Sequence, residues 1–585
     1  MVVTRKKSPE NERTTRDLPQ KQELKPPPSM QRPPRPYLIP VVIVSLTLLA
    51  LVGVFRFIGQ RWQFSWDDHS AKEPQTVSKG EGKAKVAEEP EEITQDPTAD
   101  FKGLGSTRGW MADFIANWMQ YVADLKNRGA IPNEALLTFH DQAAYDKFLA
   151  DAAAAGLKIK GQDGKNLTLR VGYEDAADLR KYLADHPESG ANVAVNYFVS
   201  APEVPTAAER ATSGNVPFGD SALAFIGAGK NANGGRGVKV AILDSAVSAE
   251  SVFGQRLVSQ QLAADADADL SHGTAVASIA GGVNGVAPAS TILSMAVVGA
   301  DGMSDSFTLA QGIIAAADQG ARVLNISLGS YGDSEYLAQA VAYAQGLGAV
   351  VVASSGNDGY TNSTYPARYS GVIAVGAIDA YGQLVGFSNA SQNYGLTAPG
   401  LEVTASLPGE QQEAFTGTSA AAPFVTGAIA SVMSAYPGMS AQDAANLLIT
   451  YANDGGAAGV DADYGYGILN VQRVLNRSTP NLTDLAVTAN YFDAKATGGP
   501  AVQYVVQNQG TTVGANWQLE TNTGGASQTW SLPLLQPNGV TYVTVPVNAA
   551  DLASGVRLQS ILKAPTGVAD FNLQNNGRGT LVQLQ

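Results

Sequence analysis

Three residues of this chain have the types, the order and the local context needed for nucleophilic catalysis by a serine. Ser419 stands in GTSAAAP (residues 417–423) before an Ala- and Gly-rich helical stretch, so its small neighbours allow a nucleophile at a helix N-terminus. His272 is the one histidine between Asp244 and the C-terminus, which makes it the candidate general base. Asp244 ends an apolar run, where catalytic groups of parallel sheets gather, and it would hold the imidazole in one tautomer. Each residue alone fits an ordinary structural role; the set predicts acyl transfer to Ser419.

A fourth residue, Asn357 in SSGND (residues 354–358), completes a family resemblance. The contexts ILDSA, SHGTAVAS, SSGND and GTSAAAP, in this order, resemble those of the subtilisin-like serine proteases. The resemblance implies a catalytic triad of Asp244, His272 and Ser419, with the Asn357 amide donating to the oxyanion beside the Ser419 N–H. The family pattern D-[ST]-G is broken at Ala246, whose extra methyl group is expected to strain the turn without displacing the carboxylate.

The resemblance also implies where a polypeptide substrate binds. One segment would pair with the substrate backbone, strand against strand, and a second would help to wall the S1 pocket. The first segment is Ser327, Leu328 and Gly329, and the second is Ala353, Ser354, Ser355 and Gly356. The sequence indicates no cofactor and no metal-ligand set, and it leaves structural calcium open.

The catalytic domain is expected at residues 215–475. Five apolar runs (VKVAIL, TILSMAVV, VLNISLG, AVVVAS and VIAVGA) alternate there with helical stretches. Continuous apolar strands between helices are typical of a parallel sheet that is covered on both faces. The expected fold class is therefore α/β, with the doubly wound parallel sheet of subtilisin.

A small α/β unit is expected at residues 131–201, beginning with a strand at 133–139. Its pattern of strand, helix, two strands, helix and strand is the split βαβ arrangement. Directly before a subtilisin-like domain, it resembles the subtilisin propeptide, which implies a folding chaperone and inhibitor. An unrelated spacer domain is the alternative. The polar segment between residues 199 and 215 would then be the place of self-cleavage.

The N-terminal region predicts a membrane anchor. Residues 1–36 form a basic, proline-rich tail, and residues 37–58 form an apolar segment of about the 20 residues that a membrane helix needs. A buried helix and a cleaved signal peptide are the alternatives, but the run is long for a signal peptide and no A-x-A-like site follows it. The basic tail should stay in the cytoplasm, so the catalytic domain would be periplasmic or extracellular. Residues 59–130 are expected to form a charged tether and a helix, and self-cleavage would release the enzyme.

The cysteine content and the net charge exclude several kinds of site and partner. The 585 residues contain no cysteine, which excludes disulfides and thiolate metal sites and favours a bacterial exported protein. The net charge is −14, and residues 1–36 have a surplus of five positive charges, so the remainder carries −19 and nucleic acid is not the expected partner.

Residues 480–585 alternate apolar and polar residues between turns, which predicts a β-sandwich. This region resembles the immunoglobulin-like CARDB domain, which implies a spacer or a module that binds a protein or surface partner.

Two functions therefore compete. The first is a membrane-anchored, extracytoplasmic serine endopeptidase that works through an acyl-enzyme intermediate. The alternative is a catalytically inactive surface-binding or adhesion protein on a protease scaffold, which the complete set of four site residues disfavours. A lipase or esterase would need G-x-S-x-G and a serine before the histidine, and neither is present.

Overall fold

The computed structural model describes residues 129–582, except for 188–189, 205, 207–214, 230, 268, 391–393, 458, 494–495, 497–498, 524 and 548–555. The predicted cytoplasmic tail (1–36), membrane anchor (37–58) and most of the tether with its helix (59–130) lie outside these residues. Among the described helices, one is apolar and long enough to cross a membrane by composition, α10 (Thr418–Ala435). Because 83% of that segment is buried inside the protein, it is packed as a core helix.

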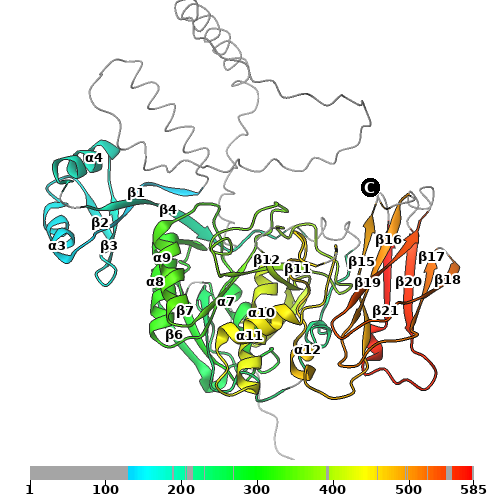
Figure 1. Cartoon of the computed structure of the whole chain (residues 1–585). Coiled ribbons are helices and arrows are strands. Elements are labelled where there is room, and N and C mark those ends of the chain that lie inside the picture. The colour runs from blue at the N-terminus through cyan, green and yellow to red at the C-terminus, as the bar shows by residue number, and fades with distance from the viewer. Residues whose placement is uncertain are drawn as a thin grey trace, which may run out of the picture. The chain divides into compact units, whose positions relative to one another are not determined.

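The first folded region, here called the N-terminal unit, is a four-stranded antiparallel sheet with two helices (Figure 1). Its elements are β1 (Ala130–Thr138), α3 (Gln142–Asp151), β2 (Lys158–Asp163), β3 (Thr168–Gly172), α4 (Ala176–Asp185) and β4 (Asn192–Ser200). The strand order β2-β3-β1-β4 interleaves two βαβ units. Side-chain oxygens of Asp141 and Asp175 accept the free N–H groups at the starts of α3 and α4, which fixes where both helices begin.

The central region is built on a seven-stranded parallel sheet in the order β12-β11-β10-β9-β5-β7-β6. Its strands are β5 (Lys239–Asp244), β6 (Leu257–Gln261), β7 (Thr291–Ala296), β9 (Val323–Ile326), β10 (Val350–Ser354), β11 (Ile373–Ile378) and β12 (Tyr394–Pro399). The five predicted apolar runs are the five inner strands, so the predicted parallel sheet is confirmed. The two edge strands lack such a signal: β6 is largely exposed and reads LVSQQ.

Helices cover both faces of this sheet (Figure 1). The side chains of β5 alternate between these two faces. Val240 and Ile242 join one buried cluster, and Ala241 and Leu243 join the other. The first cluster includes α6 (Ala222–Phe225), α7 (Ser271–Gly281), α10, α11 (Ala441–Thr450) and α12 (Val471–Asn476), and the second includes α8 (Ser306–Asp318) and α9 (Glu335–Gly346). A strand that is buried on both faces has no polar alternation, which is why its sequence is continuously apolar.

Smaller elements complete the central region. They are the short helix η3 (Gly254–Arg256), the strand β8 (Met303–Asp305), and the hairpin of β13 (Val403–Leu407) and β14 (Gln411–Phe415). The strand β8 pairs with β4 of the N-terminal unit and extends that sheet to five strands. The end of β4 is thereby fixed against the central region.

The C-terminal region consists of two antiparallel sheets, β15-β16-β19 and β18-β17-β20-β21. The strands are β15 (Leu485–Asp493), β16 (Ala501–Asn508), β17 (Gln518–Thr523), β18 (Ala526–Ser531), β19 (Val540–Pro546), β20 (Val556–Lys563) and β21 (Gly577–Val582), with the short helix η4 (Leu573–Asn575). Val502 and Tyr504 of one sheet and Leu519 and Leu558 of the other belong to one buried cluster. Arg473 of the central region donates to Gln507 and Asn538, which ties this region to α12.

Candidate active site

The candidate residues gather at the carboxyl ends of the parallel strands, because the strands that carry them are neighbours. Asp244 ends β5, Ser327 directly follows β9, and Asn357 comes three residues after β10. The order β10-β9-β5 puts these carboxyl ends side by side, which is where open α/β sheets form their sites. His272 and Ser419 come to this end of the sheet as the second residues of α7 and α10. In the described part of the chain no three His, Cys, Asp or Glu side chains converge, so we assign no metal site.

Asp244 holds the imidazole of His272 in a fixed orientation. Its carboxylate Oδ1 lies 2.7 Å from His272 Nδ1, and the same oxygen accepts the N–H of Ser245 at 2.7 Å. The Asp244 residue is fully buried, whereas a quarter of the His272 side chain remains exposed. An imidazole that donates from Nδ1 to this carboxylate keeps Nε2 as the proton acceptor, which is the tautomer a general base needs.

The glycine after the histidine is required by a close approach of backbone to backbone. A Cβ on Gly273 would lie 2.1 Å from the carbonyl oxygen of Ser245, which is far inside van der Waals contact. The Gly273 N–H also donates to Ser245 Oγ at 2.9 Å, so the first turn of α7 is fixed to the end of β5. The strain expected at Ala246 is not found, because Ala246 is not among the described non-glycine residues with positive φ. An L residue with ordinary backbone angles carries its methyl group there without cost.

The environment of His272 raises its pKa above the ordinary value. Burial alone would lower the pKa, but the charge of Asp244 and the hydrogen bond to it outweigh burial, and the charge of Asp269 adds to them. The ring of Phe415 meets the imidazole edge to face at 5.3 Å and covers it from β14. The site therefore favours a proton on the imidazole, which is the state that forms after the base has accepted one.

We expect the acid limb of the kcat/KM profile of the activated enzyme to lie above pH 6.5, the ordinary pKa of histidine. Below the raised pKa of His272 the imidazolium cannot accept a proton, and above it the base is neutral and active. Asp269→Asn should move the limb to lower pH without changing the plateau, because Asn keeps the acceptor for Ser271 N and loses only the charge. Initial rates between about pH 5 and 9, at low and high salt, test this. An acid limb below pH 6.5 would contradict it.

Ser419 stands at the start of α10, where Gly417 has a φ of +129° that a side chain would strain. Pro423 cannot donate to the carbonyl of Ser419 four residues earlier, and Ser327 Oγ donates to that carbonyl at 3.1 Å instead. The Ser419 hydroxyl donates to the carbonyl oxygen of Ser327 at 3.2 Å. Ser419 is thus held by Ser327 through two hydrogen bonds, and it is only 2% exposed.

Asn357 is oriented by Thr418, the residue before Ser419. Its Oδ1 accepts both the backbone N–H and the hydroxyl of Thr418, each at 2.9 Å. This turns the amide Nδ2 the other way, where it donates to the carbonyl oxygen of Pro202 at 3.2 Å. A side-chain N–H that donates to a peptide carbonyl is the kind of group that could also donate to an oxyanion.

The two expected substrate-binding segments differ in what the structure shows of them. Gly329 exchanges two backbone hydrogen bonds with Ser200, of 2.9 and 3.2 Å, so this segment pairs with the end of β4 in this chain. Leu328 is buried in the core below it. In the second segment, three side chains are fully buried, those of Ala353, Ser354 and Ser355.

Thr364 and Asn389 also help to build this end of the sheet, and the sequence gives no signal of either. A Cβ on Gly329 would lie 2.3 Å from Thr364 Oγ1, and one on Gly356 would lie 2.3 Å from Asn389 Nδ2, so both glycines make room for these side chains. Asn389 is fully buried and accepts the N–H groups of Asp358 and Tyr360 while it donates to Ser355 O. It thereby holds the loop that carries Asn357. Thr364 and Asn389 lie in loops without a periodic pattern, and only their long-range contacts reveal them.

Known proteins match this chain over its central region and beyond. The profile of the Subtilase family matches residues 235–467. Subtilisin BL from Lederbergia lenta is 35% identical over 266 residues, which is 44% of this chain and 98% of that protein, and an alkaline protease from Shouchella clausii is 34% identical over 48% of this chain and 73% of its own length. The crystal structure of fervidolysin from Fervidobacterium pennivorans shares the fold with a TM-score of 0.51 at 18% identity, over 78% of this chain and 96% of that one. The chain belongs to the subtilase family and is a subtilisin-like serine endopeptidase.

Proposed function

We propose that this endopeptidase hydrolyses peptide bonds through Asp244, His272 and Ser419, with Asn357 as an oxyanion donor, in a membrane-anchored and extracytoplasmic enzyme. The observation that carries the catalytic part is the hydrogen bond of 2.7 Å between Asp244 and His272, at the end of the sheet to which the N-terminus of α10 also brings Ser419. Polypeptides are the substrates. No contact among the described residues favours the inactive alternative.

In this mechanism His272 takes the proton of the Ser419 hydroxyl while Oγ attacks the substrate carbonyl carbon. The negative charge that develops on the carbonyl oxygen accepts hydrogen bonds from Asn357 Nδ2 and the Ser419 N–H. The imidazolium gives its proton to the leaving amine, and the C–N bond breaks to leave an acyl-enzyme. Water then repeats the sequence and frees Ser419. Before the first step, the Ser419 hydroxyl must turn from the Ser327 carbonyl, to which it donates at 3.2 Å, towards the imidazole.

A fluorophosphonate probe tests the role of Ser419 directly. We expect one covalent adduct per chain on Ser419, found by peptide mass spectrometry, and no labelling of Ser419→Ala. Ser327→Ala is the matched control, because it keeps the Ser419 hydroxyl and loses a neighbouring one, which donates to Ser419 O and accepts the Asn325 amide. An adduct on another serine, or no adduct with an enzyme that hydrolyses casein, would refute the assignment.

The membrane part of the proposal is supported by the sequence alone, through the basic tail and the apolar segment at residues 37–58. We expect the protein in the membrane fraction and its catalytic domain accessible from outside. Proteinase added to intact spheroplasts should cut the catalytic domain and spare the N-terminal tail. Protection of the catalytic domain, with loss of the tail, would mean the opposite orientation.

We propose further roles for the two flanking regions. The N-terminal unit acts as the propeptide, supported by its split βαβ order and by its pairing with β8. The C-terminal region is a β-sandwich of the immunoglobulin-like CARDB type, supported by its two sheets and their shared core. Tyr542 of that region donates to Asp454 at 2.9 Å, which favours a module fixed to the catalytic domain.

A further inference from the structure

The segment that leaves the N-terminal unit, residues 200–204, lies in the active site as a substrate would. Ser200 pairs antiparallel with Gly329, and two residues later the carbonyl oxygen of Pro202 accepts the Asn357 amide at 3.2 Å. On the other side of this carbonyl, Val204 lies beside Gly417, where an added Cβ would be 3.6 Å from Val204 Cγ2. The peptide bond between Pro202 and Glu203 therefore occupies the place of a bond to be cut.

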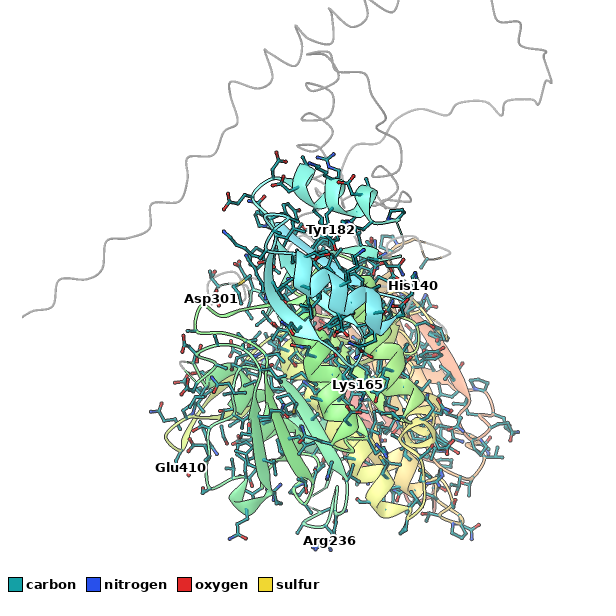
Figure 2. The ribbon with its side chains drawn as sticks, turned by 90° about the vertical axis from the view of Figure 1, so that its left-hand side faces the viewer. His140, Lys165, Tyr182, Arg236, Asp301 and Glu410 are labelled. Carbon is teal, nitrogen blue, oxygen red and sulfur yellow. The ribbon has the colours of Figure 1, made fainter. Side chains whose placement is uncertain are left out.

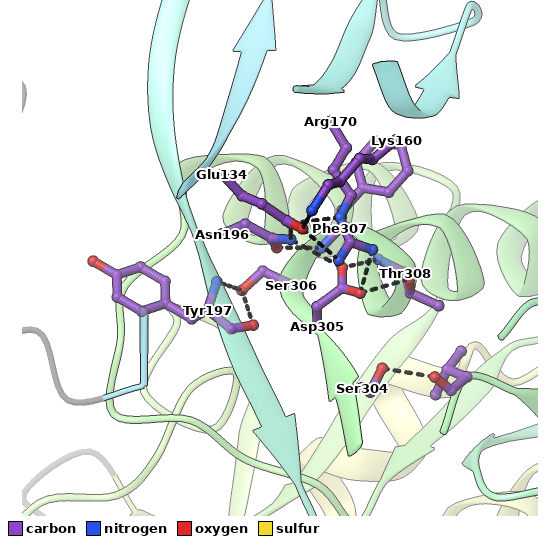
Figure 3. A network of polar contacts seen from close by, with 11 residues as sticks. Glu134, Lys160, Arg170, Asn196, Tyr197, Ser304, Asp305, Ser306, Phe307 and Thr308 are labelled. Atoms are coloured by element: carbon purple, nitrogen blue, oxygen red, sulfur yellow. Dashed lines mark hydrogen bonds and ion pairs between the residues drawn. The ribbon is translucent and has the colours of Figure 1, made fainter. Parts of the chain in front are cut away.

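The strand before this segment is fixed by a buried polar network (Figure 3). Arg170 donates to Glu134 at 2.6 Å within the N-terminal unit and to Asp305 of β8 at 2.8 Å. Burial would raise the pKa of Glu134, but its hydrogen bonds from Arg170, Lys160 and Asn196 outweigh burial and lower it. Asn196 of β4 also accepts the N–H of Phe307 at 3.2 Å, in the first turn of α8. These groups fix the register of β4 on the catalytic domain.

A second contact ties the N-terminal unit to the helices of the catalytic domain. Lys165, from the turn between β2 and β3, donates to Asp318 of α8 at 2.6 Å and to Tyr343 of α9 at 2.8 Å (Figure 2). At the end of β4, Val199 is fully buried in the same cluster as Leu328. Contacts remote from Asn357 thus fix the end of β4, from which residues 200–204 continue into the site.

The residue at position 202 determines whether the Ser327 carbonyl has a peptide N–H as its hydrogen-bond donor. In the antiparallel register that pairs Ser200 with Gly329, residue 202 stands opposite Ser327, and its N–H would face the Ser327 carbonyl. Proline has no N–H, so this carbonyl lacks its peptide donor. The Ser419 hydroxyl donates to it instead, at 3.2 Å. Among the described residues, the hydrogen-bond partner found for the Ser419 hydroxyl is thus the Ser327 carbonyl, and none is found between Ser419 and His272.

We propose that Pro202 makes residues 200–204 a resident inhibitor that the enzyme cuts slowly, with the Ser327 carbonyl as the group that decides between the resting and the reactive serine. The inference rests on the proposed function. A residue with an N–H at position 202 occupies the Ser327 carbonyl and frees the Ser419 hydroxyl for His272. Oγ then attacks the carbonyl carbon of residue 202, the C–N bond to Glu203 breaks, and its nitrogen takes the proton from the imidazolium. Water hydrolyses the resulting ester and restores Ser419.

Four full-length proteins test this: the wild type, Pro202→Ala, the double variant Ala201→Pro with Pro202→Ala, and Pro202→Ala with Ser419→Ala. The double variant Ala201→Pro with Pro202→Ala keeps the composition and moves the proline by one position, where Ala201 N–H donates no hydrogen bond within the described residues. N-terminal sequencing over time should show a new terminus at Glu203, about tenfold faster or more in both active variants than in the wild type, as expected for one orienting hydrogen bond. The variant that combines Pro202→Ala with Ser419→Ala should not form the Glu203 terminus. Fluorophosphonate labelling of Ser419 should rise with the appearance of Glu203.

Two results would overturn the inference. One is a wild type that forms the Glu203 terminus as fast as Pro202→Ala, because the proline would then be an ordinary residue before the cut. The other is an intact wild type that labels and hydrolyses peptides at the rate of Pro202→Ala, because residues 200–204 would then not block the site. Failure of the proposed function looks different: no variant would label at Ser419 or hydrolyse casein. Thermal unfolding of each variant before processing confirms that the proteins compared are folded.

Discussion

Ser419→Ala should lower kcat/KM on casein by about a million-fold, the loss expected when the nucleophile of a triad is removed. What remains would be the modest acceleration that an oxyanion site gives without a nucleophile, about a thousand-fold over water. The fold should survive. The lost hydroxyl makes one hydrogen bond, to the Ser327 carbonyl, and such a bond contributes about 1 kcal/mol to the free energy of unfolding.

Ser431→Ala is the matched control for this variant. Ser431 lies on the same helix, is buried, and donates its hydroxyl to the carbonyl of Val286 at 3.1 Å. It should lose a similar amount of stability and keep its activity. Casein hydrolysis and thermal unfolding, measured on both variants after activation, separate chemistry from folding. Casein cleavage by Ser419→Ala at the wild-type rate would refute the triad.

The site residues that could be predicted from the sequence are those whose immediate neighbours are restricted by sterics or by backbone conformation. Gly273 follows His272 because no side chain fits against Ser245, and Gly417 stands two residues before Ser419 because its φ is +129°. Such steric demands leave a short pattern in the chain. The inner strands were predictable for a related reason, since burial on both faces requires a continuous apolar run.

The rest of the site depends on contacts between distant segments, which leave no local pattern. Thr364 and Asn389 matter because Gly329 and Gly356 face them. The position of Pro202 follows from a register set by β8 and by the network around Arg170. A sequence pattern can predict that a linker reaches an active site, but it cannot say which carbonyl meets Asn357.

Asn357→Asp should lower kcat/KM by about a hundred- to a thousand-fold, the effect of losing one oxyanion donor. The substitution is chosen because Asp keeps the oxygen that accepts the N–H and hydroxyl of Thr418 and replaces only the donating amide. The start of α10 should therefore stay intact. The new carboxylate oxygen would face the developing oxyanion, and its charge adds to the loss.

Asn357→Ala separates the two roles of this side chain, since it removes both the amide donor and the acceptor for Thr418. It should lose activity to a comparable extent and, in addition, about 1 kcal/mol of stability, as when a helix-capping acceptor is removed. Values of kcat and KM measured apart should show the loss in kcat, because the amide acts on charge that exists only in the transition state. A loss confined to KM would make Asn357 a group that binds the substrate. Unchanged activity in Asn357→Asp would remove it from the mechanism, whatever the stability of Asn357→Ala.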